Sequence, residues 1–331
     1  MNTWIKQIME SPVRIAIPIM THPGIEETGH TTREAVTDGN IHFQAIKAVA
    51  DTYQTAACTV IMDLTVEAEA FGASISMTEH EIPNVTGRLV YDEASVKQLQ
   101  VPSLSSGRVP EYLKANRLAV EYCAGKPVLS GCIGPFSLAG RLYDMSEIMM
   151  GIYLEPETIH LLLDKCTEFI IHYCRELKKI GATGVVVAEP AAGLLSNEDC
   201  LAYSSAYMKR MVEAVQDDSF VVILHNCGNK GQCTQAMLET GCMALHFGNA
   251  VNMIETLETS PADVLMMGNI DPVGVLKQAS AEKVYQVTAD LLSQTARYPN
   301  FVLSSGCDMP PGVPAENIHA FYQALADFNI R

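Results

Sequence analysis

Short apolar runs alternate along this chain with longer segments in which apolar residues recur at helical spacing. Eight runs have the length and composition of buried strands: 13–19, 58–64, 127–133, 184–190, 220–226, 243–248, 264–270 and 301–307. Strands that are apolar on both faces are typical of a parallel sheet covered by helices. The segments between them, such as 157–180, show the spacing of amphipathic helices.

Eight strand–helix units in one chain predict an α/β fold, a closed (β/α)8 TIM barrel. The interval 65–126 departs from the alternation because it is polar and rich in turn residues. We interpret it as an elaborated insertion after the second strand, with the position of a lid. No linker, low-complexity segment or internal repeat interrupts the pattern, so residues 1–331 are predicted to form a single domain.

Composition narrows the range of functions. The chain of 331 residues is 48% hydrophobic and 18% charged, with a net charge of −16. An acidic surface argues against nucleic acid as a partner, because phosphate binding needs clustered Lys and Arg. Ten cysteines are scattered and several lie in apolar runs, where free cysteine is usually a core residue. With no apolar stretch of signal-peptide or membrane-span length, a cytoplasmic protein without membrane contact is predicted.

Polar residues that carry chemistry gather where the predicted strands end. They are Asp63, Glu189, His225, Cys227, His246, Asn269, Asp271, Cys307 and Asp308. In a barrel of alternating strands and helices, the carboxyl ends of the strands meet on one face, where active sites are built. These side chains are therefore expected on one rim.

Three of these residues form a candidate zinc site. His225 and Cys227 follow one strand, and Cys307 follows another. Two thiolates and an imidazole suit zinc, and three protein ligands leave the fourth position for substrate. Taken singly, a cysteine after an apolar strand is usually packing, and His-x-Cys is a weak motif. Their combination on one predicted rim favours a metal.

Several segments match the pattern of a known family: MDLTVEAEAFGA (62–73), EIPNVTGRLV (81–90), GCIGPFSLAGRL (131–142), LHNCGN (224–229), MGNIDPVGVL (267–276) and SSGCDMPPGVPAENI (304–318). On these segments the chain resembles the uroporphyrinogen decarboxylase superfamily. Within it, the chain is most similar to the corrinoid-dependent methylcobamide:coenzyme M methyltransferase branch. The resemblance implies a TIM barrel and zinc bound by His225, Cys227 and Cys307. It also implies a corrinoid carried by a separate partner protein.

The resemblance further implies a reaction of one-carbon metabolism. A methyl group would pass from the protein-bound corrinoid to a thiol such as coenzyme M. The thiol would bind zinc as a thiolate and attack the methyl group. An alternative is a donor-side enzyme that demethylates a methoxylated or methylamine-type substrate and charges the corrinoid. The parent decarboxylase, a lyase, is less favoured, because its arginine-containing Arg-Gln-Ala-Gly segment is missing and Arg33 stands alone in that region. No Asp-x-His-x-x-Gly loop of a corrinoid carrier is present.

The other rim residues are given catalytic roles with structural alternatives. Glu189 is interpreted as a resting fourth zinc ligand or a general base, or else as a carboxylate bonded to a neighbouring loop. Asp271 either orients His225 or caps the loop before Pro272, and Asp63 lines the pocket. His246 is expected to pack or to support a ligand from behind.

Two features of the expected site are left open by the sequence: the resting fourth zinc ligand and the cationic contact for the acceptor. Asn249 stands where relatives are expected to carry an acidic residue, which leaves the resting fourth ligand open. A sulfonate on the acceptor would need a cationic contact, for which Arg141 and Lys230 are the candidates.

Overall fold

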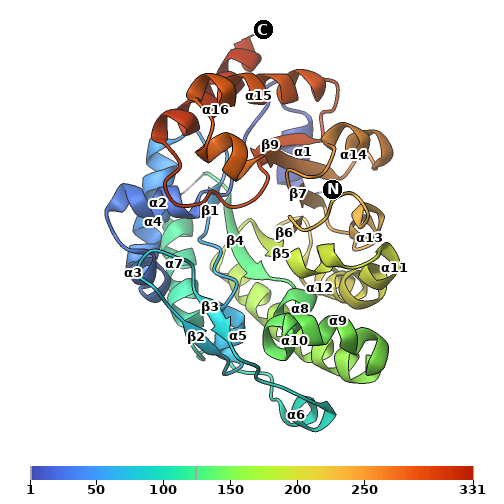
Figure 1. Cartoon of the computed structure of the whole chain (residues 1–331). Helices are drawn as coiled ribbons and strands as arrows, with labels where there is room; N and C mark the ends of the chain where they lie inside the picture. Colours follow the sequence, from blue (N-terminus) through green and yellow to red (C-terminus); the bar gives the residue numbers. More distant parts are fainter. Residues whose placement is uncertain (1, 124, 331) are drawn as a thin grey trace.

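The centre of the computed structural model, which describes residues 2–123 and 125–330, is a curled parallel sheet (Figure 1). Its strand order is β1-β4-β5-β6-β7-β8-β9. The bounds are β1 (Cys58–Thr59), β4 (Val128–Ile133), β5 (Gly184–Ala188), β6 (Val221–Asn226), β7 (Ala244–Phe247), β8 (Leu265–Ile270) and β9 (Phe301–Ser305). Sequential strands are neighbours throughout, as right-handed strand–helix–strand units require.

The first of the eight predicted strands, 13–19, is an extended segment that forms a bridge at Ala16. Ala16 forms a parallel bridge with Leu303 of β9, and Ile17 N–H donates to the Leu303 carbonyl at 2.9 Å. On its other side, the Ala16 carbonyl accepts from Ala56 N–H at 3.0 Å, just before β1. The segment thus joins the two edges of the sheet, and the predicted (β/α)8 barrel is confirmed.

Strand β1 is shorter than the run 58–64 that predicted it. Val60 N–H still donates to the Leu129 carbonyl of β4 at 3.1 Å. Beyond it, Ile61 N–H donates to the His42 ring at Nε2, 3.1 Å away. The ladder therefore ends where a buried side chain replaces a neighbouring strand as the hydrogen-bond partner.

Helices cover the outside of the barrel (Figure 1). Their bounds are α1 (Thr3–Met9), α2 (Thr21–Thr28), α3 (Thr32–Thr37), α4 (Gly39–Thr52), α5 (Val66–Ala70), α6 (Glu93–Gln98), α7 (Val109–Tyr122), α8 (Pro135–Tyr143), α9 (Met145–Leu154), α10 (Pro156–Ile180), α11 (Asn197–Cys200), α12 (Ala206–Val215), α13 (Thr234–Leu238), α14 (Met253–Thr259), α15 (Ala281–Gln294) and α16 (Ala315–Ile330). Short 3-10 or π turns occupy η1 (Pro190–Leu194), η2 (Leu201–Ser205) and η3 (Pro272–Lys277). Across the described residues, none of these helices combines the length and apolarity that crossing a membrane would demand.

The interval 65–126, predicted as an insertion, is ordered into several elements. It begins with α5 and an antiparallel hairpin of β2 (Ser74–Ser76) and β3 (Asn84–Thr86). After α6, helix α7 leads back into β4 and packs beside α4. The hairpin and α6 project from one side of the barrel (Figure 1).

Alternate strand residues separate the barrel interior from the helix-facing layer. Val186 of β5 and Ile223 of β6 belong to the interior cluster, which Ile5 of α1 joins. Their neighbour Val185 belongs instead to the larger cluster that packs under the helices. This period of two means that the inward positions continue at each carboxyl end with residues two further along.

Protonation of His42 should make stability depend on pH. Burial lowers the pKa of this neutral histidine to about 3, against about 6.5 in an unfolded chain. At a pH between these two pKa values, His42 is protonated in the unfolded chain and neutral in the folded protein, so the free energy of unfolding falls as pH falls. We expect wild type to lose about 1.4 kcal/mol more per pH unit below 6.5 than His42→Gln does. Urea unfolding at pH 7, 6 and 5 measures this, and parallel stability curves for the two proteins would contradict it.

Candidate metal centre

The period of two places three polar residues in one interior layer at the carboxyl rim. Each lies two residues after an interior apolar residue of its strand: His225 after Ile223 on β6, His246 after Ala244 on β7, and Ser304 after Val302 on β9. His225 and His246 are direct register partners across the β6–β7 pair. The three residues are buried, with exposed fractions of 2%, 1% and 0%.

His225, Cys227 and Cys307 form a candidate metal centre. One donor atom from each lies within 4.8 Å of the others. Among residues 2–123 and 125–330, this is the one group of His, Cys, Asp or Glu side chains with donor atoms this close together. His225 Nε2 and Cys307 Sγ are 3.6 Å apart. A tetrahedral zinc with bonds of about 2.0 Å to nitrogen and 2.3 Å to sulfur separates such donors by roughly 3.5 Å, close to the observed distance. The residues therefore fit zinc.

A chain of hydrogen bonds fixes which nitrogen of His225 faces the cysteines. The Ser304 hydroxyl donates to the Ile17 carbonyl at 2.7 Å, so it accepts from His246 Nε2 at 2.8 Å. Burial lowers the pKa of His246 well below its usual range, so its ring is neutral and Nδ1 is an acceptor. His225 Nδ1, at 2.7 Å, donates to it. The lone pair of His225 Nε2 is left free for a metal, and the expected supporting role of His246 is confirmed.

The two cysteines share a proton in this site. A hydrogen bond from the Cys307 thiol lowers the pKa of Cys227 to about 7. The same pairing, together with burial, raises the pKa of Cys307. One thiolate is thus available at neutral pH, and a metal that displaces the shared proton would take the second.

Close packing holds the Cys227 loop against the next strand end. A Cβ atom on Gly248 would lie 2.8 Å from the Cys227 carbonyl oxygen and 2.9 Å from its Cα. Any side chain at this position would push the Cys227 loop away from the barrel. Glycine at 248 is therefore a condition for the donor spacing.

Glu189 and Asp271 have the contacts of their structural alternatives. The Glu189 carboxylate accepts from Phe136 N–H at 2.7 Å and Ser137 N–H at 2.8 Å, at the beginning of α8. Asp271 accepts from Val273 and Gly274 N–H, both at 2.9 Å, and so caps η3. His246 makes the contact to His225 that was expected of Asp271.

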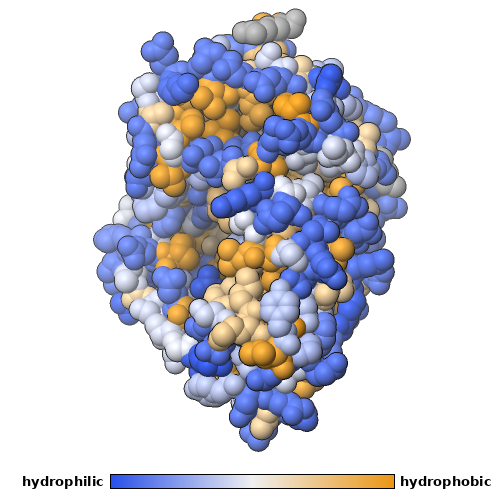
Figure 2. Space-filling view, turned by 45° about the vertical axis from the view of Figure 1, so that its right-hand side comes forward, coloured by the Kyte–Doolittle hydropathy of each residue, from blue (hydrophilic) through white to orange (hydrophobic). Residues whose placement is uncertain are grey.

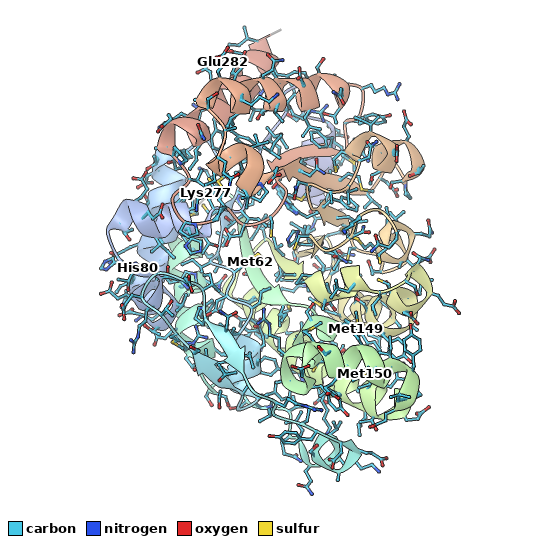
Figure 3. The ribbon with its side chains drawn as sticks, viewed as in Figure 1. Met62, His80, Met149, Met150, Lys277 and Glu282 are labelled. Atoms are coloured by element: carbon cyan, nitrogen blue, oxygen red, sulfur yellow. The ribbon has the colours of Figure 1, made fainter. Side chains whose placement is uncertain are left out.

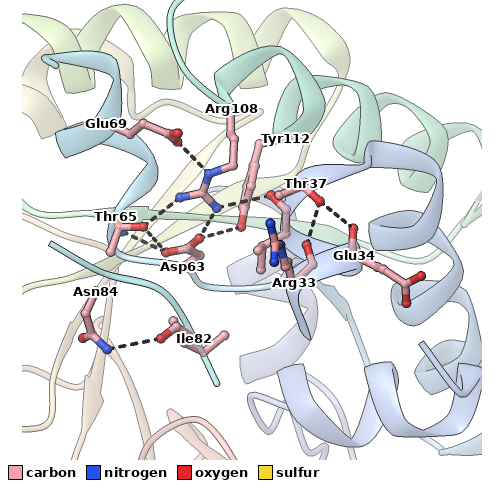
Figure 4. A network of polar contacts seen from close by, with 11 residues as sticks. Arg33, Glu34, Thr37, Asp63, Thr65, Glu69, Ile82, Asn84, Arg108 and Tyr112 are labelled. Carbon is pink, nitrogen blue, oxygen red and sulfur yellow. Dashed lines mark hydrogen bonds and ion pairs between the residues drawn. The ribbon is translucent and has the colours of Figure 1, made fainter. Parts of the chain in front are cut away.

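Asp63 is held in a buried polar network (Figure 4). Its Oδ2 forms an ion pair with the Arg108 guanidinium, and its Oδ1 accepts from the Thr65 hydroxyl at 2.7 Å. Arg108 also bonds Glu69 Oε2 through Nε at 2.6 Å. Asp63 and Arg108 are 4% and 7% exposed. These contacts connect the end of the run 58–64, which contains β1, to α5 and α7.

Sequence analysis missed Arg108 and Ser304. Arg108 lies in a polar, turn-rich stretch that gives no sign of burial, and its carboxylate partners are distant in sequence. Ser304 could have been found, because it occupies the same inward phase as Val302 in an otherwise apolar run.

Breaking the Asp63–Arg108 pair should destabilise the protein strongly. Arg108→Met leaves a buried carboxylate without its cation, at an expected cost of about 3–5 kcal/mol. Asp63→Asn combined with Arg108→Met should cost several kcal/mol less than the sum of the two single changes. Urea unfolding measures both. Arg33→Met, which breaks an exposed pair with Glu79, serves as the control, and an equal loss in it and in Arg108→Met would refute the assignment.

Comparisons with known proteins show which family and fold the chain shares. The family model described as Uroporphyrinogen decarboxylase (URO-D) matches residues 6–328. The chain is 26% identical over 309 residues to a methylcobamide:CoM methyltransferase of Methanosarcina acetivorans, covering 92% of this chain and 83% of that protein. It is 25% identical over 285 residues to a uroporphyrinogen decarboxylase of Legionella pneumophila, covering 84% and 80%. A solved methyltransferase from Methanosarcina mazei shares the fold, with a TM-score of 0.89, 23% identity and coverage of 98% and 97%.

Proposed function

The chain belongs to the uroporphyrinogen decarboxylase family, and from this premise we propose that it is a zinc-dependent methyltransferase. It transfers a methyl group from a methylated corrinoid to a thiol such as coenzyme M. The observation that carries the proposal is the His225–Cys227–Cys307 group, which fits zinc in donor type and spacing. Similarity to a methylcobamide:CoM methyltransferase supports the substrates.

The chain's own residues prepare the site for a thiol. His225 and the two cysteines would hold zinc as a neutral set of one imidazole and two thiolates. Zinc in that position would supply charge that favours the thiolate form of a bound thiol. His246 and Ser304 keep the His225 ring in the tautomer that presents Nε2. The buried position of His225 limits access of water to this side of the cluster.

The methylated corrinoid is proposed to arrive on a partner protein that docks at the carboxyl rim. Several large apolar side chains are exposed on elements that follow β4 and β5 in the chain: Met150, Tyr153 and Leu154 of α9, and Leu194 of η1. Met150 is labelled on this part of the chain in Figure 3. Apolar residues also surround the hollow in the middle of the face seen in Figure 2. Clustered exposed apolar surface is characteristic of interaction sites.

Loss of one zinc ligand should abolish both metal binding and methyl transfer. We expect Cys307→Ala to bind much less zinc and to slow thiol-dependent demethylation of free methylcobalamin by more than about 100-fold, because even residues behind a ligand are worth 10- to 100-fold. Zinc content and the colour change of the corrinoid measure the two effects. Cys242→Ala, a buried cysteine outside the group, is the control and should retain zinc.

The outcomes separate the alternatives. Full zinc content in Cys307→Ala would remove Cys307 from the ligand set. Zinc-loaded wild type that turns over no thiol would reject the acceptor-side proposal and direct the search to methoxylated or methylamine-type donors.

His246 should tune metal affinity without touching the metal. His246→Phe removes the acceptor for His225 Nδ1–H, so zinc affinity should fall about 10- to 100-fold. Competition with a coloured chelator measures it. His160→Phe changes a partly buried histidine that hydrogen-bonds Tyr207 on the outer helices and serves as the control. Unchanged affinity in His246→Phe would show that the relay does not orient His225.

A further inference from the structure

A pocket of about 370 Å³ opens on the carboxyl side of the barrel, beside the candidate metal centre. Its walls come from the end of β4, from β3 and the loop after it, from α8 and from η1. The lining includes Ile133, Ser137, Arg141, Pro190, Ala191 and Leu194. The volume lies within the range of small-molecule sites, roughly 300–1,000 Å³. One full positive charge, that of Arg141, lines it.

Arg141 differs from the other inward-facing arginines because its guanidinium has no partner. Arg14 donates to four backbone carbonyls, the shortest contact being 2.7 Å to Tyr298. Arg108 is bound by two carboxylates. In the described ranges 2–123 and 125–330, Arg141 makes neither a hydrogen bond nor an ion pair, although burial is sufficient to lower its pKa. A half-buried guanidinium without an acceptor is unfavourable until an anion supplies one.

The nearby acids do not neutralise Arg141. Asp63 and Glu67 are its closest charged influences. Asp63 is already paired with Arg108, and burial raises the pKa of Glu67 to about 8, so that its carboxyl is mostly protonated at neutral pH. Asp144 also lines the pocket, but its Oδ1 accepts from Ser146 and Glu147 N–H at the start of α9. None of these acids is therefore bonded to Arg141, whose guanidinium remains open to a ligand.

One turn of chain separates this pocket from the metal centre. Pro190, Ala191 and Leu194 of η1 face the pocket. The other side of η1 packs on the loop after Cys227, where a Cβ on Gly228 would lie 2.5 Å from the Pro190 carbonyl oxygen. The single turn of η1 thus lies between the pocket and the Cys227 loop, and the two are neighbours at the same rim.

We propose that Arg141 binds the anionic end of a small thiol substrate, a sulfonate or carboxylate, in this pocket. The inference rests on the methyl-transfer function proposed above and adds the residue that selects the anionic end of the thiol. Lys230, the other cationic candidate from the sequence, is exposed and does not line the pocket. Arg141 would act in specificity and leave the reacting sulfur to the metal centre.

Matched thiols with and without the charge test this role. With methylcobalamin as donor, Arg141→Met should raise KM for 2-mercaptoethanesulfonate about 10- to 100-fold, the value of a hydrogen-bonded charge pair. KM for 2-mercaptoethanol and kcat for both thiols should change less than about twofold. Arg141→Lys should recover part of the lost affinity. Lys209→Met, an equal charge change on the exposed face of α12, should behave as wild type.

A binding measurement keeps the inference independent of activity. Ethanesulfonate and propionate, which lack a thiol, are titrated calorimetrically into zinc-loaded wild type and Arg141→Met, and their relative affinities decide between sulfonate and carboxylate. Binding by wild type that is lost in Arg141→Met supports the role, even if no thiol is methylated and the proposed function fails. Equal binding to both proteins, no binding to wild type, or an equal rise in KM for both thiols would overturn it. If Arg141→Met does not fold, Arg141→Gln replaces it in both measurements.

Discussion

The candidate site depends on one hydrogen-bonded relay that begins in the backbone of the barrel. The Ile17 carbonyl accepts from Ser304, Ser304 accepts from His246, and His246 accepts from His225. Ile17 belongs to the segment that joins β9 to the β1 edge, so the backbone that closes the barrel also anchors the relay that orients the His225 imidazole. The relay works because each group in it is buried and has one remaining partner, which leaves a single consistent assignment of protons.

The carboxylates near the rim have different structural roles, which depend on the groups that the fold places beside each of them. Glu189 caps α8, Asp271 caps η3, and Asp63 is paired with Arg108. Each charge is satisfied by backbone N–H groups or a guanidinium, which makes these residues part of the scaffold of the rim. Arg141 is the contrasting case, a cation that the fold partly buries and leaves unpaired. The rim therefore combines soft donors at one place with a partly buried cation, unpaired among the described residues, at another.

Much of the fold could be predicted because the strands are apolar on both faces and appear in sequential order. The exceptions lie at the seam of the barrel. The run 58–64 predicted a full strand, yet the ladder ends early because His42 takes the N–H of Ile61. The first strand is reduced to a bridge at Ala16. Beyond that bridge the Ser305 hydroxyl accepts from Ile19 N–H. In both cases a side chain distant in sequence supplies a hydrogen bond that strand propensity cannot foresee.

The sequence by itself determined the strand–helix alternation, the inward phase of each strand and the three soft donors at strand ends. These follow from local periodicity and residue type, which act over a few positions. The tertiary structure decided which donors meet, which nitrogen of His225 faces them, and which acids are already engaged. It also decided that Arg108 is paired while Arg141 is not, although both are arginines beside polar segments. Pairing, burial and proton placement depend on contacts between residues far apart in the chain, and only the closed barrel brings these residues within bonding distance.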